Sequence, residues 1–397
     1  MSRKANGVSR RNVLKLTGGS LAATGVSGLA AAKPTDKVEV NVGIKSGCGR
    51  SAALSAASDV VREFNSIDVL TIRVPKKAIS GLQNNPNVRY VEENGTMHAL
   101  AETEPWGIER VDADVAHANG ETGAGADIAI IDTGIDDDHP DLQANLGSGR
   151  AFVSCNTQGG CRYGAKPANN TCNNSWTDDN DHGTHCAGIA DAVDNSQGVI
   201  GVSTQATLHA VKVLDKCGSG SFSDIAAGVE YVADQGWDVG SMSLGASSGS
   251  QALRDACQYA VNNGVFLVAA AGNSGPCTDC VGYPAAYPEV MAVSSTNSSD
   301  GLSSFSSTGA EVEIAAPGSS IYSSVASNGG YDTFSGTSMA CPHVAGAAGQ
   351  LMVNGASNTQ ARETLKQTAE NIGLSSNESG SGLLDVAAAL GYDSSDN

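Results

Sequence analysis

The sequence predicts an α/β protein: a doubly wound, mostly parallel sheet with helices on both faces, preceded by a small α+β domain. Four short segments after residue 100 are almost continuously apolar, as expected of strands buried on both faces: residues 128–131, 208–213, 265–268 and 290–293. Three longer segments have the apolar spacing of helices: residues 223–235, 251–262 and 338–353. In such a fold the ligand site lies beyond the carboxyl ends of the strands.

The preceding block, residues 33–100, follows another pattern. Residues 38–44, 69–74 and 88–93 alternate between apolar and polar side chains and predict strands, and residues 52–65 predict a helix. This block has little material for a core and is typical of a small interaction module.

Charge is unevenly distributed along the 397 residues. From Ala101 onward there are 35 acidic and 9 basic residues, hence −26, whereas residues 1–100 have 14 basic and 7 acidic residues, hence +7. So acidic a surface argues against nucleic acid and anionic membranes as partners. It is typical of a protein that stays soluble in high salt, where counter-ions screen self-repulsion.

Residues 1–32 predict an export signal. Arg10 and Arg11 precede a weakly apolar Gly/Ala/Leu run that ends in three alanines at 30–32. This pattern resembles a twin-arginine signal peptide, and the run is too short and glycine-rich to remain as a membrane span. We therefore expect secretion to the cell exterior, without stable membrane association.

Ten cysteines suit an oxidising destination. Nine lie beyond Ala101, so at least one is unpaired there. The best candidates for disulfides share two polar loops, and spacing leaves their connectivity open: Cys155, Cys161, Cys172, Cys277 and Cys280. A zinc site is the competing interpretation, but no histidine flanks these cysteines.

Four polar residues lie where predicted elements begin or end. Asp132 and Asn273 each follow an apolar strand, whereas His182 opens an apolar run and Ser338 opens the last helix. Each alone has a structural explanation as a turn residue, a core histidine or a helix cap. Together they supply acyl-transfer chemistry, because a serine nucleophile needs a base, the base needs an orienting carboxylate, and the oxyanion needs donors. No Gly-x-Ser-x-Gly elbow surrounds Ser338, which disfavours a serine esterase.

The segments that contain these residues, 132–135, 182–185, 271–273 and 336–340, resemble the catalytic blocks of the subtilisin family, in the same order. The similarity runs from about Val38 to Ala389 and is closest in character to secreted, salt-adapted halolysin- and thermitase-like members. It implies a subtilisin-like fold and a secreted serine endopeptidase. Asp132, His182 and Ser338 would form the triad, with the Asn273 side chain and the Ser338 N–H as oxyanion donors.

The resemblance also implies how a peptide substrate is held. Two segments would pair with an extended peptide from opposite sides, namely Gly218, Ser219 and Gly220 against Ser243, Leu244 and Gly245. Ala270, Ala271 and Gly272 would form one wall of the specificity pocket, with Gly282 near its floor, which favours large apolar residues before the scissile bond. The dipeptide Tyr283 and Pro284 resembles the family's cis-proline site.

A structural calcium ion is a further implication. The matching oxygen ligands are Glu102, Asp141, Val193, Asn195, Gln197 and Val199. Asp178, Asp179 and Asp181 are candidates for a second site, and the alternative is a solvated acidic loop. Cys186 and Cys341 are expected to be small buried thiols.

Residues 33–100 resemble the family's inhibitory propeptide, with autocleavage expected between Leu100 and Ala101 ahead of a peptidase domain at 101–397. From Lys33 this block has 9 basic and 7 acidic residues, a charge opposite in sign to that of the acidic domain. The expected partners are peptide or protein substrates and the chain's own propeptide, and the protein is expected to be a monomer. The alternative is a non-catalytic, acidic, calcium-binding exported protein of the same fold, disfavoured because no catalytic position is replaced. A dedicated processing protease would need an acid-lined pocket, of which Gly282 gives no sign.

Overall fold

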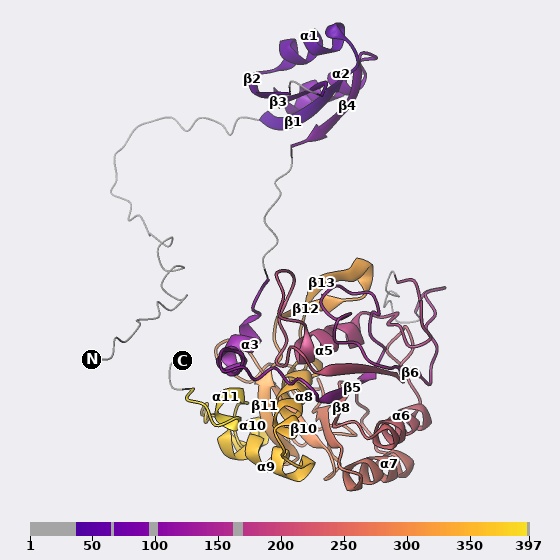
Figure 1. Cartoon of the computed structure of the whole chain (residues 1–397), viewed down its shortest axis with the longest axis vertical. Helices are drawn as coiled ribbons and strands as arrows, with labels where there is room; N and C mark the ends of the chain where they lie inside the picture. The colour runs from indigo at the N-terminus through magenta and orange to yellow at the C-terminus, as the bar shows by residue number, and fades with distance from the viewer. Residues whose placement is uncertain (1–36, 65–66, 95–101, 162–169, 395–397) are drawn as a thin grey trace, which may run out of the picture. The chain divides into compact units, whose positions relative to one another are not determined.

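The computed structural model describes residues 37–64, 67–94, 102–161 and 170–394 (Figure 1). The chain divides into two compact units, Met1–His98 and Ala99–Asn397. The export signal at 1–32 and the junction between Leu100 and Ala101 lie outside the described residues, so both stay predictions.

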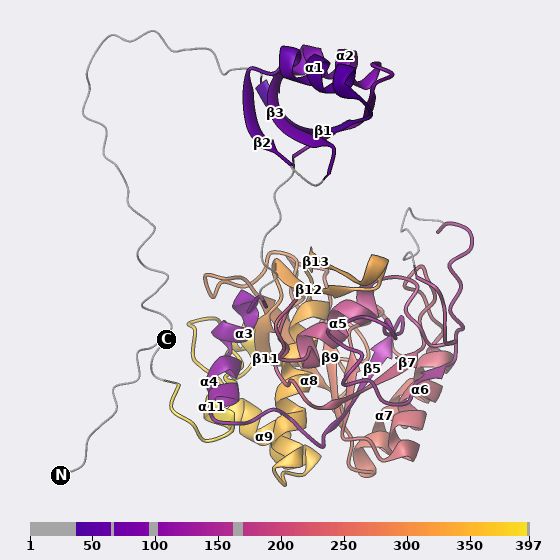
Figure 2. The same cartoon turned by 45° about the horizontal axis from the view of Figure 1, so that its top comes forward.

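The smaller unit is a four-stranded antiparallel sheet covered by two helices (Figure 2). The strand order is β2-β3-β1-β4, and its core includes Val40, Val42, Leu70 and Ile72. The elements are β1 (Lys37–Ile44), α1 (Gly47–Ala56), β2 (Asp59–Glu63), β3 (Val69–Pro75), α2 (Ile79–Gln83) and β4 (Val88–Glu93).

The prediction of a helix over residues 52–65 is wrong. The helix α1 begins earlier and ends at Ala56, and residues 59–63 form the strand β2. All five residues of β2 are exposed, so no burial pattern marks them as a strand. Main-chain pairing selects the conformation, with Val60 opposite Ile72 of β3, and this partner is visible only in the folded unit.

The larger unit is built on a seven-stranded parallel sheet of order β11-β10-β9-β8-β5-β7-β6. The strands are β5 (Asp127–Asp132), β6 (Arg150–Ala151), β7 (Thr207–Lys212), β8 (Val239–Met242), β9 (Phe266–Ala270), β10 (Met291–Thr296) and β11 (Val312–Pro317). A separate hairpin consists of β12 (Ile321–Val325) and β13 (Gly330–Phe334). The helices are α3 (Trp106–Arg110), α4 (Ala113–Ala118), α5 (His182–Asp191), α6 (Phe222–Gln235), α7 (Gln251–Asn262), α8 (Thr337–Val353), α9 (Asn358–Thr368), α10 (Ser376–Ser379) and α11 (Val386–Ala389).

Both faces of this sheet are buried, which confirms the doubly wound prediction. Along β5, Ile128 and Ile130 enter one core with residues of α5, α8 and α9, whereas Ala129 and Ile131 enter a second core with residues of α6 and α7 (Figure 1). The alternation follows from the two-residue period of a strand.

The three predicted helices match α6, α7 and α8 to within one residue. The prediction missed β8 because Gly240 and Ser241 interrupt its apolar run. A Cβ atom at position 240 would lie 2.8 Å from Cδ2 of Leu267 on β9, so the glycine that interrupts the apolar run also leaves room for this leucine side chain.

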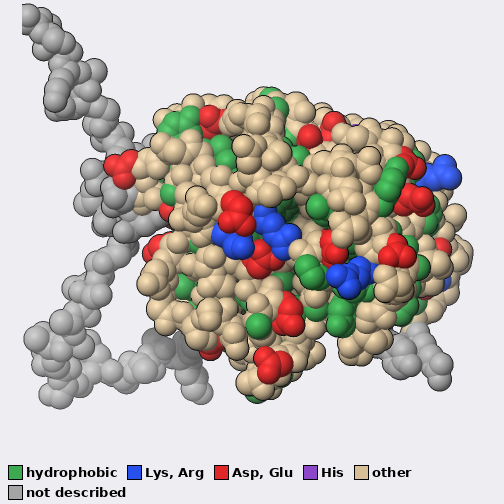
Figure 3. Space-filling model, turned by 90° about the horizontal axis from the view of Figure 1, so that it is seen from below, with side chains coloured by type: hydrophobic (Ala, Val, Ile, Leu, Met, Phe, Trp, Pro, Cys, Tyr) green, Lys and Arg blue, Asp and Glu red, His purple; other side chains and the backbone are tan. Residues whose placement is uncertain are grey.

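On the face seen in Figure 3, basic side chains lie beside acidic ones. Arg362 and Lys366 both contact Glu313, and Arg254 lies 3.5 Å from Glu289. Among the helices of the described residues, none combines the length and apolarity needed to cross a bilayer.

Three disulfides are present in the described residues: Cys155–Cys172, Cys161–Cys217 and Cys277–Cys280. All five cysteines proposed from the sequence are paired. The sixth paired cysteine, Cys217, was not predicted because it lies 56 residues from its partner Cys161. Cys186 and Cys341 are free and buried, as predicted.

Candidate active site

The four candidate catalytic residues lie at the carboxyl end of the parallel sheet. Asp132 ends β5, His182 begins α5, and Ser338 is the second residue of α8. The start of α5 approaches the turn after β5 closely, because a Cβ atom at Gly183 would lie 2.1 Å from the Gly134 carbonyl oxygen. The missing side chain at Gly183 therefore lets the imidazole reach the end of β5.

His182 is oriented by a buried carboxylate. Its Nδ1 lies 2.8 Å from Oδ1 of Asp132, which also accepts the N–H of Thr133 at 2.7 Å. Because a carboxylate accepts, Nδ1 carries the proton and Nε2 is the basic nitrogen. Burial lowers the pKa of His182, but the charge of Asp132 and its hydrogen bond outweigh burial, so the pKa is raised above its ordinary value of 6.5.

Ser338 lies beside the helix that carries the histidine. Cys186, one turn after His182 on α5, contacts the Ser338 carbonyl oxygen at 3.4 Å. The Ser338 hydroxyl donates to the Ser243 carbonyl at 3.3 Å, and within the described residues it makes no hydrogen bond to His182. A change of its χ1 rotamer redirects Oγ, and such hydrogen bonds commonly tighten only when substrate binds.

Asn273, in the loop after β9, is held in one orientation by Thr337. Its Oδ1 accepts both the Thr337 N–H at 2.9 Å and the Thr337 hydroxyl at 3.0 Å. Since a backbone N–H can only donate, the oxygen of the amide must face Thr337. The Nδ2 donor is therefore left for the cavity that Asn273 and Ser338 line together.

Two cavities meet at the segment 243–245. One, of about 410 Å³, is lined by that segment and by Ala270, Gly272, Asn273, Gly282 and Ser338. The other, of about 620 Å³, lies between the same segment and residues 218–220, and His182 borders it. Nearly every substrate-binding residue expected from the sequence therefore lines one of two adjoining cavities.

Ala271 is the exception among those residues, because it is fully buried and does not line either cavity. Its carbonyl accepts the Gly282 N–H at 2.9 Å, so it supports the cavity floor from behind. The Tyr283–Pro284 peptide bond is cis, as predicted, and Gly275–Pro276 is also cis.

A comparison with known protein families matches residues 123–383 to the subtilase family. The chain belongs to the subtilase family of serine endopeptidases. It is 40% identical over 384 residues to subtilisin amylosacchariticus of Bacillus subtilis subsp. amylosacchariticus, which covers 93% of this chain and 95% of that protein. It is 41% identical over 333 residues to an alkaline protease of Shouchella clausii, covering 83% of this chain and 81% of that protein. Alkaline elastase YaB of Bacillus sp. (strain YaB) is 40% identical over 341 residues, 85% of this chain and 84% of that protein.

The expected calcium ligands of this subtilase converge around Asp141. The Asp141 carboxylate accepts the Val199 N–H at 2.8 Å and the Asn195 side-chain amide at 3.1 Å, and Glu102 accepts the Asn195 N–H at 2.6 Å. In the described part of the chain, the carbonyls of Val193, Gln197 and Val199 accept no hydrogen bond. Burial, with the nearby charges of Asp194 and Asp141, raises the pKa of Glu102 to about 7, against the lowering effect of the Asn195 N–H.

The three acids proposed for a second calcium site do not converge on one point. Asp178 accepts two hydrogen bonds from Thr184, Asp179 forms an ion pair with Lys212, and Asp181 accepts two hydrogen bonds from Ser327. Because each carboxylate already has its own protein partner, the structure gives no support to a shared cation there, and we do not propose one.

Sequence reasoning missed two groups of residues around the site. The role of Thr337 in orienting Asn273 cannot be recognised from the sequence, because only the fold places Thr337 beside the loop after β9. The 620 Å³ cavity includes the apolar residues Leu214, Phe222, Ile225 and Leu253. No signal in the sequence could separate these four from ordinary core residues at helical or strand spacing.

Proposed function

We propose that this subtilase is a secreted endopeptidase of broad specificity that uses Ser338 as nucleophile, His182 as general base and Asp132 as orienting carboxylate. The observation that carries this proposal is the 2.8 Å contact between His182 Nδ1 and buried Asp132, which leaves Nε2 as the basic nitrogen of a histidine that borders the 620 Å³ cavity. The non-catalytic alternative gives no reason for a buried carboxylate to orient a histidine at the mouth of a cavity.

In the proposed reaction, Ser338 Oγ attacks the peptide carbonyl while its proton passes to Nε2 of His182. The Asp132 carboxylate stabilises the imidazolium that forms. The oxyanion accepts hydrogen bonds from Nδ2 of Asn273 and from the Ser338 N–H at the start of α8. His182 then gives its proton to the leaving amine, and a water molecule releases the acyl group by the reverse steps.

The specificity pocket is proposed to be the 410 Å³ cavity. Its floor is formed by backbone, because a Cβ atom at Gly282 would lie 3.1 Å from the Ala246 carbonyl oxygen. Among the described residues, the lining includes one carboxylate, Asp279, but no Lys or Arg. A volume of this size accepts large apolar side chains, and we expect Phe, Tyr and Leu to be favoured before the scissile bond.

Casein hydrolysis by the purified protein, in high salt with calcium, tests the proposal. Hydrolysis should be lost after treatment with a serine-phosphonylating reagent and in Ser338→Ala. The alanine variant should also retain residues 33–100, because we propose that the enzyme cleaves its own junction between Leu100 and Ala101. Correctly processed wild type that hydrolyses no casein would refute the catalytic proposal.

We further propose a structural Ca²⁺ at the Asp141 site, which fits the residues present: two carboxylates, one side-chain amide and three carbonyls that accept no hydrogen bond from any described residue. Bound there, the ion would neutralise the crowded acids Glu102, Asp141 and Asp194 and join residue 102 to the loop 193–199. Its role is stability, because none of these residues borders the two cavities.

Export by the twin-arginine route and adaptation to high salt complete the proposal. The charge of −26 from 35 acidic and 9 basic residues beyond Ala101 supports salt adaptation. Replacing Arg10 and Arg11 by Lys should leave the protein inside the cell. Loss of activity on transfer from dilute buffer to concentrated KCl would contradict salt adaptation.

A further inference from the structure

The segment 216–220, here called the substrate edge, belongs to no strand; residues 218–220 are exposed, whereas Lys216 and Cys217 are half-buried. Its turn is shaped by Asp215, whose Oδ1 accepts the N–H groups of Cys217 at 2.8 Å and Ser219 at 3.0 Å, and Gly218 has a φ of +70°. These bonds lie within the turn. They define its shape but do not attach it to the body of the molecule.

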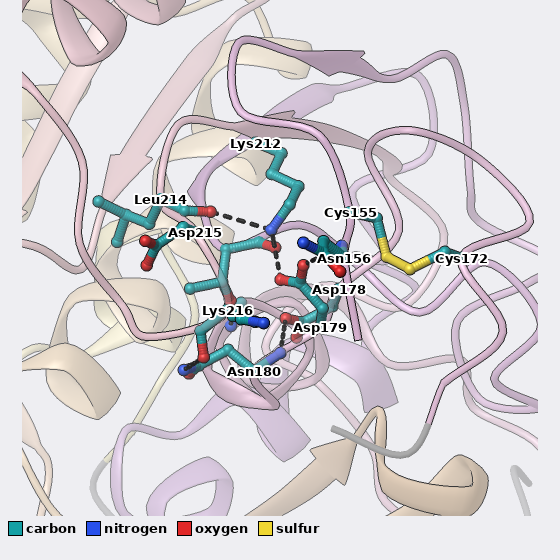
Figure 4. A network of polar contacts seen from close by, with 12 residues as sticks. Cys155, Asn156, Cys172, Asp178, Asp179, Asn180, Lys212, Leu214, Asp215 and Lys216 are labelled. Atoms are coloured by element: carbon teal, nitrogen blue, oxygen red, sulfur yellow. Dashed lines mark hydrogen bonds and ion pairs between the residues drawn. A yellow bond between two sulfur atoms is a disulfide. The ribbon is translucent and has the colours of Figure 1, made fainter. Parts of the chain in front are cut away.

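The chain just before the substrate edge is anchored by a buried lysine (Figure 4). Lys212, the last residue of β7, is fully buried, and its Nζ donates to the Leu214 carbonyl at 2.9 Å. The same ammonium donates to the Thr133 carbonyl at 2.5 Å and to Oδ1 of Asp179 at 2.6 Å. This network fixes the chain as far as Leu214, next to the turn that follows Asp132.

Within the described residues the substrate edge itself has three attachments beyond its own turn, and the longest is the 3.4 Å hydrogen bond that Lys216 Nζ donates to the Gly159 carbonyl. Nδ2 of Asn180 donates to the Lys216 carbonyl at 2.9 Å, and the Cys161–Cys217 disulfide joins the edge to the polar loop that contains Cys155 and Cys172. Cys217 directly precedes Gly218, so the covalent link acts at the start of the exposed residues.

The polar loop is in turn anchored to the body. The Cys155–Cys172 disulfide closes it, and the Asn156 N–H donates at 2.6 Å to Oδ2 of Asp179, the carboxylate whose other oxygen is paired with Lys212. Asp179 and Asn180 lie shortly before His182 in the chain. The loop is therefore linked to the substrate edge by the Cys161–Cys217 disulfide, and both are linked by hydrogen bonds to the segment that leads to His182.

We propose that the Cys161–Cys217 disulfide is a specificity-determining staple that holds the substrate edge where an extended peptide can pair with it. The disulfide should increase the binding affinity only of substrates that are long enough to reach residues 218–220. A substrate confined to the 410 Å³ cavity does not touch the substrate edge. The disulfide acts through the edge and is a positioning element. This inference rests on the proposed function.

The test compares two substrates on two disulfide variants. The long substrate is a tetrapeptide anilide ending in phenylalanine, and the short one is an N-acetylphenylalanine ester. The variant Cys161→Ser/Cys217→Ser should raise KM for the tetrapeptide about tenfold, the size expected from losing one or two net main-chain hydrogen bonds, with the ester changed by less than about twofold. The matched control, Cys155→Ser/Cys172→Ser, removes the neighbouring disulfide and should change tetrapeptide KM by less than about threefold, because the staple and the Asp179 anchor remain.

An equal rise in KM for the tetrapeptide and for the ester would overturn the inference. An unchanged tetrapeptide KM in a variant whose mass confirms that the disulfide is missing would also overturn it. If Cys161→Ser/Cys217→Ser fails to fold, folded wild type is titrated with dithiothreitol. KM for both substrates is then plotted against the fraction of each disulfide that remains, as measured by mass spectrometry. The tetrapeptide KM should rise as Cys161–Cys217 is reduced, and no rise after complete reduction refutes the staple. Failure of wild type to hydrolyse either substrate would instead refute the proposed function.

Discussion

Replacing the buried Lys212 by Met should destabilise the larger unit strongly. The change removes the donor to the carbonyls of Thr133 and Leu214 and leaves Asp179, with 1% of its side chain exposed, as a buried acid without its cation. Removing one partner of a buried ion pair costs about 3–5 kcal/mol. For a unit of this size that corresponds to a fall of roughly 5–15 °C in the thermal midpoint.

The midpoint is measured by calorimetry in a Ser338→Ala background, so that autolysis is prevented and every variant remains the same full chain. A single scan rate is used because unfolding of secreted proteases is commonly irreversible. The double variant Lys212→Met/Asp179→Asn should recover at least half of the loss, because no charge is then left unpaired and the new amide oxygen at position 179 can still accept the Asn156 N–H. A fall below about 2 °C in the single variant, or no recovery in the double one, would refute the reasoning that charge compensation stabilises the larger unit.

Three further predictions concern chemistry and calcium. Since His182 must be neutral to act and its pKa is raised by Asp132 against burial, kcat/KM should fall as pH drops, with a midpoint above 6.5. Asp132→Asn should move that midpoint downward in a pH profile, and a wild-type midpoint below 6.5 would contradict the assignment. Asn273→Leu should lower kcat about 10²–10³-fold with little change in KM, the range known for the oxyanion asparagine of subtilisin itself, and a loss confined to KM in steady-state kinetics would disprove the oxyanion role. Chelation by EDTA should lower the thermal midpoint by roughly 5–10 °C, as expected for losing a ligand present in large excess over its Kd, and Asp141→Asn should abolish that difference.

Local sequence predicted four central strands and three long helices, although it missed the buried strand β11 and the buried helix α5. The apolar runs of β5, β7, β9 and β10 and the spacing in α6, α7 and α8 predicted the α/β class, because strands and helices buried on a face repeat their apolar residues at characteristic intervals. The same reasoning failed for β2 and β8. In β2 all residues are exposed, and in β8 Gly240 and Ser241 interrupt the apolar run, so neither strand has a burial period and pairing with a neighbouring strand selects the extended conformation.

The sequence alone determined which chemical groups stand at the strand ends and their order along the chain, and thus the family. The sequence could not determine the orientation of these side chains or their hydrogen-bond and disulfide partners. Only the tertiary structure decides that Thr337 holds the amide oxygen of Asn273 and leaves its donor for the cavity that Ser338 also lines, and that Asp178, Asp179 and Asp181 have separate partners. It likewise decides that Cys217 is the partner of Cys161, across 56 residues. The physical reason is that hydrogen bonds and disulfides depend on distance and angle in space, and residues far apart in sequence acquire these only when the sheet has been assembled.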